Sequence, residues 1–353
     1  MTTTHDVGLL RLVAQRLAGP RAGSPAAAVR RLTALQGQDY PGVLTSVALR
    51  TAERSRAAVF AALDRGEVVR SWPMRGTLHL TAAEDLPWLL GLLGSRALAG
   101  AARRRAALGI TDADAARACE AAVAALSGGR RLPRAGLLAA IEAAGVAVDG
   151  QRGYHLLWYA AQTGHTCLGP TADDEQQFVL LDEWVPAPRR LDREEALAEL
   201  AGRFFTGHGP ATVHDLARWA GLPLRDARAG LAAARDRLAR LDLDGTEHFL
   251  DPATPDLLAA HRDEVRGTRL LPGFDEFVLG YGDRSAVLDP EFADRIVPGG
   301  NGMFLPTVVA GGRIVGTWRW QGSGRRRGAV GTPFRDDDAA LVATVPELAA
   351  ALP

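Results

Sequence analysis

A repeated order of elements along the chain limits its fold more than any other feature. Helices, a short turn, another helix and a β-hairpin follow one another three times within 353 residues. This order is typical of a winged helix, in which the hairpin is the wing and the helix after the turn takes the position of a recognition helix. It predicts an α+β fold of three tandem winged-helix units followed by a β-rich C-terminal part.

The first predicted unit covers residues 1–100. Ser24 and Pro25 have the residue types of an N-cap and a first helical position, and we expect their helix to end near Gln36. Thr81 and Glu84 have the spacing of a capping box that begins a further helix. The remaining elements are expected as helices over 6–18 and 54–64 and strands over 43–50, 68–72 and 77–80.

The second predicted unit covers residues 101–186, and the third covers 187–255. In the second we expect helices over 112–126, 133–144 and 154–162 and strands over 165–168 and 176–181. In the third, Thr212 and Asp215 cap a first helix, Gly221 begins the turn, and a second helix covers 224–238. Its hairpin has the type I′ turn signal Asp244-Gly245.

The last predicted part, residues 256–353, is rich in strands. Strands over 304–310 and 313–320 flank Gly311-Gly312, a pair that favours a two-residue hairpin turn. Residues 336–352 predict a closing helix.

The charge composition restricts the possible chemistry. The formal net charge is +0, which excludes a globally basic nucleic-acid binder but not local basic faces. The chain contains no lysine, so all 41 basic residues are arginines and no lysine Schiff base can form. Arginine is well suited to contacts with phosphates and bases.

Cysteine usage and hydropathy predict a protein without a metal centre and outside the membrane. Cys119 and Cys167 stand far apart and form no CxxC motif, so we expect no metal and no cofactor. The N-terminus lacks the pattern of a signal peptide, and no apolar run is long enough to cross a bilayer. We therefore expect a soluble, cytoplasmic protein. We also expect it to be a monomer.

Three polar side chains, Gln36, Gln38 and Asp39, follow an apolar stretch near the predicted helix end. A glutamine amide offers both a carbonyl acceptor and N–H donors, and it is uncharged at every pH. Two such amides with an aspartate can hold a water or a sugar oxygen, which fits a mild reaction on an activated substrate. The alternative is a polar helix end with no chemistry.

Other polar clusters leave two interpretations open. The arginine runs are candidates for phosphate contact or solvated surface, and the third hairpin carries acidic residues that disfavour phosphate contact. Asp275 and Glu276 lie between two phenylalanines. They are interpreted either as an acid–base pair or as buried groups that form structural hydrogen bonds. We expect core or capping roles for His208 and His214. The arginine runs are Arg103–Arg105, Arg130–Arg131 and Arg325–Arg327.

Five segments spread over the chain resemble the family of winged-helix DNA glycosylases that includes AlkZ and YcaQ. The resemblance implies three winged helices in a C-shaped arrangement and removal of bulky N7-alkylated guanines, including interstrand crosslinks. It also implies that Gln36 and Gln38 are the catalytic pair of the AlkZ branch, although Gly37 replaces the usual aliphatic residue between them. The segments are Leu35–Tyr40, Ser71–His79, Gly207–Thr212, Leu271–Glu276 and Gly316–Arg319.

The resemblance predicts a monofunctional DNA glycosylase that acts on double-stranded DNA carrying alkylated guanine, in self-resistance to a DNA-alkylating natural product. Gln36 and Gln38 would place the water and stabilise an oxocarbenium-like sugar, and Asp39 would assist electrostatically. The absence of lysine predicts no lysine-dependent strand cleavage. The expected DNA contacts are Arg75, Arg313, Arg319, Arg325, Arg326 and Arg327.

Two alternatives remain open at this stage. One is a non-enzymatic winged-helix DNA-binding protein, such as a transcription regulator, which would bind undamaged operator DNA sequence-selectively. The other is a family member that sequesters adducts without cleaving them.

Overall fold

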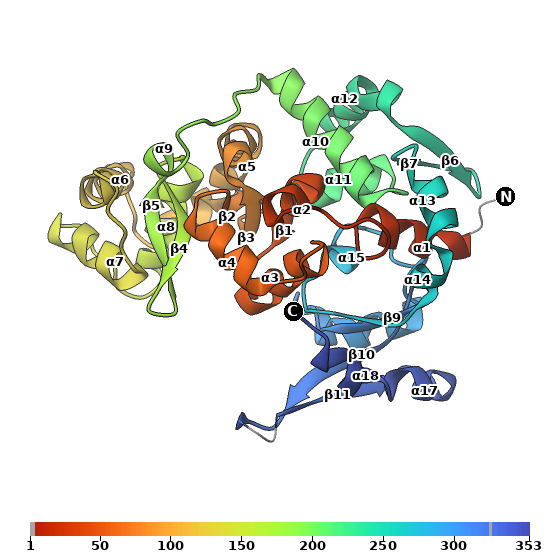
Figure 1. The fold of residues 1–353 in the computed structure, drawn as a ribbon. Coiled ribbons are helices and arrows are strands. Elements are labelled where there is room, and N and C mark those ends of the chain that lie inside the picture. Colours follow the sequence, from red (N-terminus) through yellow and green to blue (C-terminus); the bar gives the residue numbers. More distant parts are fainter. Residues whose placement is uncertain (1–3, 325–326) are drawn as a thin grey trace. The chain divides into compact units, whose positions relative to one another are not determined.

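The structure is a computed structural model that describes residues 4–324 and 327–353 (Figure 1). Its mixed α+β fold divides into two compact units. The first unit combines Met1–Ala58 with Leu197–Pro353, and the second is Val59–Ala196. The first unit therefore takes residues from both ends of the chain. The predicted boundaries at residues 100, 186 and 255 stay a prediction.

The N-terminal part of the first unit corrects two predicted elements. The helix that starts after Ser24 ends at Leu32, because Thr33 has a φ of +68° and the chain then becomes extended. Residues 43–50 are predicted as a strand, but residues 43–49 belong to a helix that Asp39 caps and Arg50 follows it as the C-cap. This helix is buried on nearly every side. A short apolar run does not distinguish a buried strand from a buried helix. The elements are α1 (Thr4–Ala14), α2 (Pro25–Leu32), β1 (Ala34–Gln36) and α3 (Tyr40–Leu49).

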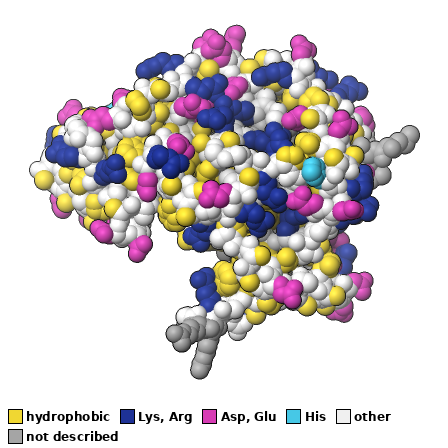
Figure 2. Space-filling view, viewed as in Figure 1, with side chains coloured by type: hydrophobic (Ala, Val, Ile, Leu, Met, Phe, Trp, Pro, Cys, Tyr) yellow, Lys and Arg dark blue, Asp and Glu magenta, His cyan; other side chains and the backbone are white. Residues whose placement is uncertain are grey.

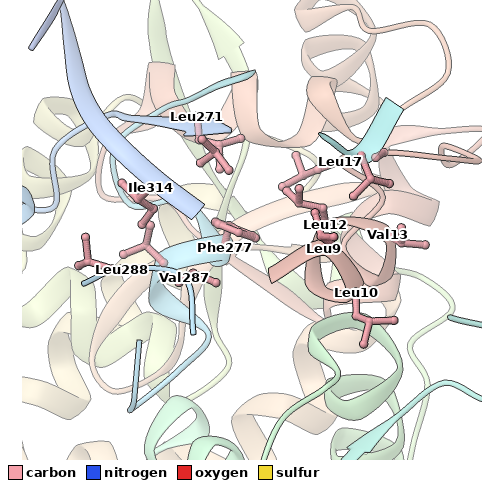
Figure 3. Packing of buried hydrophobic residues seen from close by; sticks show 14 of the residues in the cluster. Leu9, Leu10, Leu12, Val13, Leu17, Leu271, Phe277, Val287, Leu288 and Ile314 are labelled. Carbon is pink, nitrogen blue, oxygen red and sulfur yellow. The ribbon is translucent and has the colours of Figure 1, made fainter. Parts of the chain in front are cut away.

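The core of the first unit forms around α1. Leu9, Leu12 and Val13 of α1 belong to one buried cluster with Leu271 and Phe277 from the C-terminal part of the chain (Figure 3). Burying these side chains stabilises the unit by roughly 1.5–3 kcal/mol each. The cluster thus joins the two sequence segments that make up the first unit.

The segment after residue 193 contains the predicted helix–turn–helix and hairpin. The capping box of Thr212 and Asp215 is present, and Gly221 ends the first helix in the left-handed conformation. Asp244 and Gly245 have φ values of +52° and +79°, as a type I′ turn requires. The second helix ends at Ala234 and continues as a 3₁₀ turn over Arg235–Arg237. The elements are α10 (Arg193–His208), α11 (Val213–Ala220), α12 (Leu224–Ala234), β6 (Ala239–Leu243) and β7 (Thr246–Leu250).

The C-terminal part contains a four-stranded antiparallel sheet in the order β11-β10-β9-β8. Gly311 and Gly312 have φ values of +55° and +78° and form the predicted turn between β9 and β10. The predicted closing helix is broken into short pieces, and Pro346 stands in the first turn of the last one. The elements are α13 (Thr254–Ala260), α14 (Arg262–Arg266), β8 (Arg269–Leu271), α15 (Glu276–Leu279), α16 (Ala293–Ile296), β9 (Thr307–Ala310), β10 (Arg313–Gln321), β11 (Gly328–Pro333), α17 (Ala339–Val342) and α18 (Val345–Ala350).

In the second unit, four strands lie in the order β3-β2-β4-β5, so two predicted hairpins share one sheet through the pair Arg70 and Leu168. The capping box predicted at Thr81 and Glu84 is wrong: Thr81 lies inside β3, and α5 begins only at Leu86. The elements are α4 (Arg56–Asp64), β2 (Val68–Met74), β3 (Thr77–Ala82), α5 (Leu86–Ala107), α6 (Asp112–Leu126), α7 (Arg134–Ala143), α8 (Arg152–Gln162), β4 (Thr166–Ala172), β5 (Glu175–Leu180) and α9 (Leu181–Trp184).

In the part of the chain that the structure describes, every helix is too short or too polar to cross a lipid bilayer.

Candidate functional site

Gln36 and Gln38 bring their side-chain amides together in the first unit. Gln36 is the last residue of β1 and is 9% exposed, whereas Gln38 lies two residues further on and is exposed. The Nε2 group of Gln36 donates a hydrogen bond to Oε1 of Gln38 at 2.5 Å. The Nε2 group of Gln38 has no hydrogen-bond partner among residues 4–324 and 327–353. The pair therefore brings two side-chain amides together, with the amide of Gln36 buried and that of Gln38 at the surface.

The backbone of Gln36 is held by a buried carboxylate. Its N–H donates to Oε1 of Glu276 at 3.2 Å. Oε2 of the same carboxylate accepts from Nε1 of Trp219 at 2.9 Å and lies 3.3 Å from Nε2 of His208. Glu276 and His208 are both 0% exposed. A carboxylate held on two rings cannot turn easily, so it keeps the Gln36 peptide in one place.

The residue before Glu276 is fixed by a buried ion pair. The guanidinium of Arg50 donates to both oxygens of Asp275 at 2.8 Å, and the hydroxyl of Ser46 and the N–H of Phe277 donate to the same carboxylate. Burial by itself raises the pKa of Asp275, but the Arg50 charge and these hydrogen bonds outweigh it and lower that pKa below its ordinary value. Asp275 thus stays ionised inside the protein.

Gln15 and Tyr281 close the network. Nε2 of Gln15 donates to the hydroxyl of Tyr281 at 3.0 Å and to the backbone carbonyl of Glu276 at 3.3 Å. Oε1 of Gln15 accepts from Arg50 at 2.8 Å, and the Tyr281 hydroxyl donates to the His208 carbonyl at 2.7 Å. We call this set the buried polar network, and it consists of Gln15, Ser46, Arg50, His208, Trp219, Asp275, Glu276 and Tyr281.

The network connects three of the sequence segments that carry the family resemblance. Asp275 and Glu276 are buried hydrogen-bonding groups, as one of the two interpretations held, and His208 has a core position. The contributions of Gln15, Arg50 and Tyr281 were not foreseen. Their polar side chains within apolar stretches were the only available signal.

Asp39 caps a helix in this structure. Its Oδ1 accepts the N–H of Gly42 at 3.2 Å at the start of α3. This contact orients the chain just after Gln38. The electrostatic role predicted for Asp39 stays a prediction.

The predicted DNA-contacting arginines lie in both units. Arg75 is exposed at the turn between β2 and β3, with a φ of +55° and its Nη2 3.4 Å from Nε2 of the buried His79. Arg313 and Arg319 lie on β10. Arg327 is exposed, and its guanidinium carbon lies 4.4 Å from the ring centre of Trp320. Arg325 and Arg326 lie outside the described residues.

The other arginine runs take part in local contacts of the second unit. Arg105, near the end of α5, pairs with Asp112 at 2.7 Å, and Arg131 lies over the ring of Trp184 at 4.8 Å. Within the described residues, no three His, Cys, Asp or Glu side chains gather as a metal site would need.

Comparisons with known proteins identify the family. Residues 29–352 match the family described as DNA glycosylase AlkZ-like. The interstrand DNA cross-link repair glycosylase of Streptomyces sahachiroi is 28% identical over 336 residues, which is 91% of this chain and 88% of that protein. A tRNA(Ile)-lysidine synthase of Mesorhizobium japonicum is 38% identical, but over only 32% of this chain and 22% of its own length.

A solved structure has the same fold. The DNA glycosylase AlkZ of Streptomyces sahachiroi superimposes with a TM-score of 0.81 at 25% identity, covering 99% of this chain and 97% of that one. The match extends over both compact units. The family match likewise spans more than half of the sequence. The chain belongs to the AlkZ-like family of DNA glycosylases.

Proposed function

We propose that this protein hydrolyses the N-glycosidic bond of bulky N7-alkylguanine adducts or interstrand crosslinks in double-stranded DNA. Membership of the AlkZ-like family and the crosslink-repair activity named for the Streptomyces sahachiroi relative support this proposal. The observation that carries it is the paired amides of Gln36 and Gln38 on a backbone held by Glu276.

The chemistry of the lesion explains why two neutral amides suffice. Alkylation at N7 places a positive charge on guanine and makes it a good leaving group, so little acid catalysis is needed. The enzyme has to place a water and stabilise an oxocarbenium-like sugar, as other glycoside-cleaving enzymes do. The amide oxygens of Gln36 and Gln38 serve both needs, because an amide oxygen has two lone pairs and Oε1 of Gln38 can accept a second hydrogen bond beside the one from Gln36. Asp39 adds negative charge beside them.

The reaction ends at base removal. The chain has no lysine, so no lysine side chain can attack the sugar and form an imine that leads to strand cleavage.

The DNA is contacted by six arginines, and the biological role is self-resistance to a DNA-alkylating natural product. The arginines are Arg75, Arg313, Arg319, Arg325, Arg326 and Arg327.

A base-release assay tests the proposal. Purified protein is incubated with a duplex that carries one N7-alkylguanine, and the free adduct is quantified. Gln36→Ala and Gln38→Ala are expected to slow release by about 100- to 1,000-fold, as for removal of one catalytic hydrogen-bonding group. Gln151→Ala, at an exposed glutamine of the second unit, is the matched control and should leave the rate unchanged. Absence of release by the wild type, or full activity of both site variants, would contradict the proposal.

A second candidate function is non-enzymatic DNA binding. The α11–turn–α12 arrangement followed by the β6–β7 hairpin has the element order of a groove-reading unit and favours it. This function predicts sequence-selective binding to undamaged DNA with no release of adduct. Tight binding to lesion DNA with no turnover would instead identify a protein that sequesters adducts.

A further inference from the structure

A groove lined by arginines lies in the first unit, apart from Gln36 and Gln38. It has a volume of about 510 Å³, and its walls come from α2, α10, the loop after α1 and the 3₁₀ turn after α12. Figure 2 shows arginine side chains gathered on the face where Figure 1 places α2 and α10. One acid, Glu199, also lines it. The arginines are Arg16, Arg21, Arg30, Arg31, Arg203 and Arg237.

The positive charge of this arginine groove is only partly neutralised. Arg21, Arg31 and Arg203 pair with Glu264, Asp251 and Glu199 at 3.0, 3.3 and 2.7 Å. Arg16 and Arg237 form no ion pair with any residue that the structure describes. Their guanidinium groups donate to the backbone carbonyls of Pro20 and Ala198, at 3.1 and 3.4 Å.

Like charges also face one another inside the groove. The Arg31 guanidinium is largely buried, and burial together with the positive charge of Arg16 lowers its pKa. A bound anion would offset both effects, because it supplies negative charge where water is partly excluded. The groove therefore has the electrostatics of an anion site.

The lining distinguishes a phosphate from a base. No aromatic ring is present among the groove's lining residues, so a nucleobase finds nothing to stack on. Planar guanidinium groups bind phosphate oxygens in bidentate geometry. The groove also joins the site through the chain itself, because α2 carries Arg30 and Arg31 and leads directly into β1 with Gln36.

We propose that the arginine groove binds the phosphodiester backbone of duplex DNA beside the lesion. This inference rests on the proposed function, and it assigns the groove the sequence-neutral contacts that set the position of the duplex. Such contacts release counterions from the DNA, so they weaken steeply as salt rises.

The test measures binding to undamaged duplex, separately from catalysis. Fluorescence anisotropy gives the affinity at several salt concentrations for the wild type, for R16Q/R237Q and for R262Q/R266Q. The last pair removes the same charge from exposed positions on α14 outside the groove. With a slope of about 0.9 per phosphate contact, R16Q/R237Q should flatten the dependence of log affinity on log salt by about 1–2. The control should keep the wild-type slope.

A charge-retaining variant separates lost contacts from lost folding. R16K/R237K should restore most of the slope, because lysine remains a phosphate-binding point charge. Equal slopes for R16Q/R237Q and R262Q/R266Q would overturn the groove assignment. So would competition by inorganic phosphate, at matched ionic strength, that is as effective as competition by duplex. If the salt slope falls as expected but the wild type releases no adduct, the assignment of DNA binding to the groove is supported and the glycosylase proposal is contradicted.

Discussion

Two regions of the first unit show different ways of preparing a protein for a reaction. The buried polar network around Gln36 consists of side chains that are almost completely inaccessible and joined by hydrogen bonds. The strand β10 carries Arg319 on the exposed surface instead, and Arg327, the residue before β11, is also exposed and lies over the ring of Trp320. The first region fixes a geometry, and the second supplies charge.

This difference predicts different consequences of mutation. A buried charge that loses its partner keeps its desolvation cost, so damage to the network lowers stability or rate strongly. An exposed arginine is already solvated, and removing it costs little in the absence of a ligand. Substitutions in the buried polar network should therefore lower stability or rate whether or not DNA is present. Substitutions of the exposed arginines should have an effect only on DNA binding.

The largest expected effect is on stability, from Asp275→Asn. The substitution leaves the Arg50 guanidinium buried without its ion-pair partner, at a position where both side chains are at most 1% exposed. We expect the free energy of unfolding to fall by about 3–5 kcal/mol, measured by denaturant unfolding.

The comparison with an exposed pair provides the control for Asp275→Asn. Arg240 and Glu247 form an ion pair at 2.7 Å with side chains that are 55% and 49% exposed. Arg240→Met should change stability by less than about 1 kcal/mol. Equal losses of unfolding free energy for the two variants would show that burial of the ion pair does not set the cost of losing one partner.

Local features of the fold were predictable from the sequence. The turns at Asp244-Gly245 and Gly311-Gly312 and the capping box at Thr212 formed as expected, because each depends on residues close in sequence. The apolar run of α3 predicts a strand, because it is buried on nearly every side and therefore has no clear helical period. Here tertiary burial determined the structure, and the local pattern did not reveal it.

The candidate site was predictable only in part. Gln36 and Gln38 were identified by family resemblance, and their amides do lie together. The contact between Gln36 and Glu276 joins residues 240 positions apart, so no local pattern could reveal it. The same holds for Arg50 and Asp275, which are 225 positions apart. Long-range partners of this kind become visible only once the chain is folded.

The second-largest expected effect is a lower rate of adduct release after substitution of Glu276. Glu276→Ala removes the acceptor of the Gln36 N–H, whereas Glu276→Gln keeps a side-chain oxygen that can accept it. A hydrogen bond to a charged group is worth about 1.5–3 kcal/mol. We expect Glu276→Ala to lower kcat about 10- to 100-fold with little change in KM, in single-lesion assays below the unfolding temperature of the variant. Glu276→Gln should recover most of this rate.

A purely structural role for Glu276 would give a different pattern. Both variants would then lose activity in proportion to the fraction unfolded, and kcat per folded molecule would stay constant. Measuring the unfolding temperature beside kcat distinguishes the two cases. A kcat per folded molecule equal to that of the wild type would show that Glu276 does not position Gln36.

The smallest expected effect comes from the exposed arginines. Arg319→Gln removes one charge from an exposed position on β10 that pairs across the sheet with Val330. One lost phosphate contact lowers the salt slope of DNA affinity by about 0.9 and weakens binding several-fold at low salt. Thermal unfolding without DNA should not change. An effect on kcat at saturating DNA would contradict the division between the two regions, because it would mean that an exposed charge also sets the geometry at Gln36.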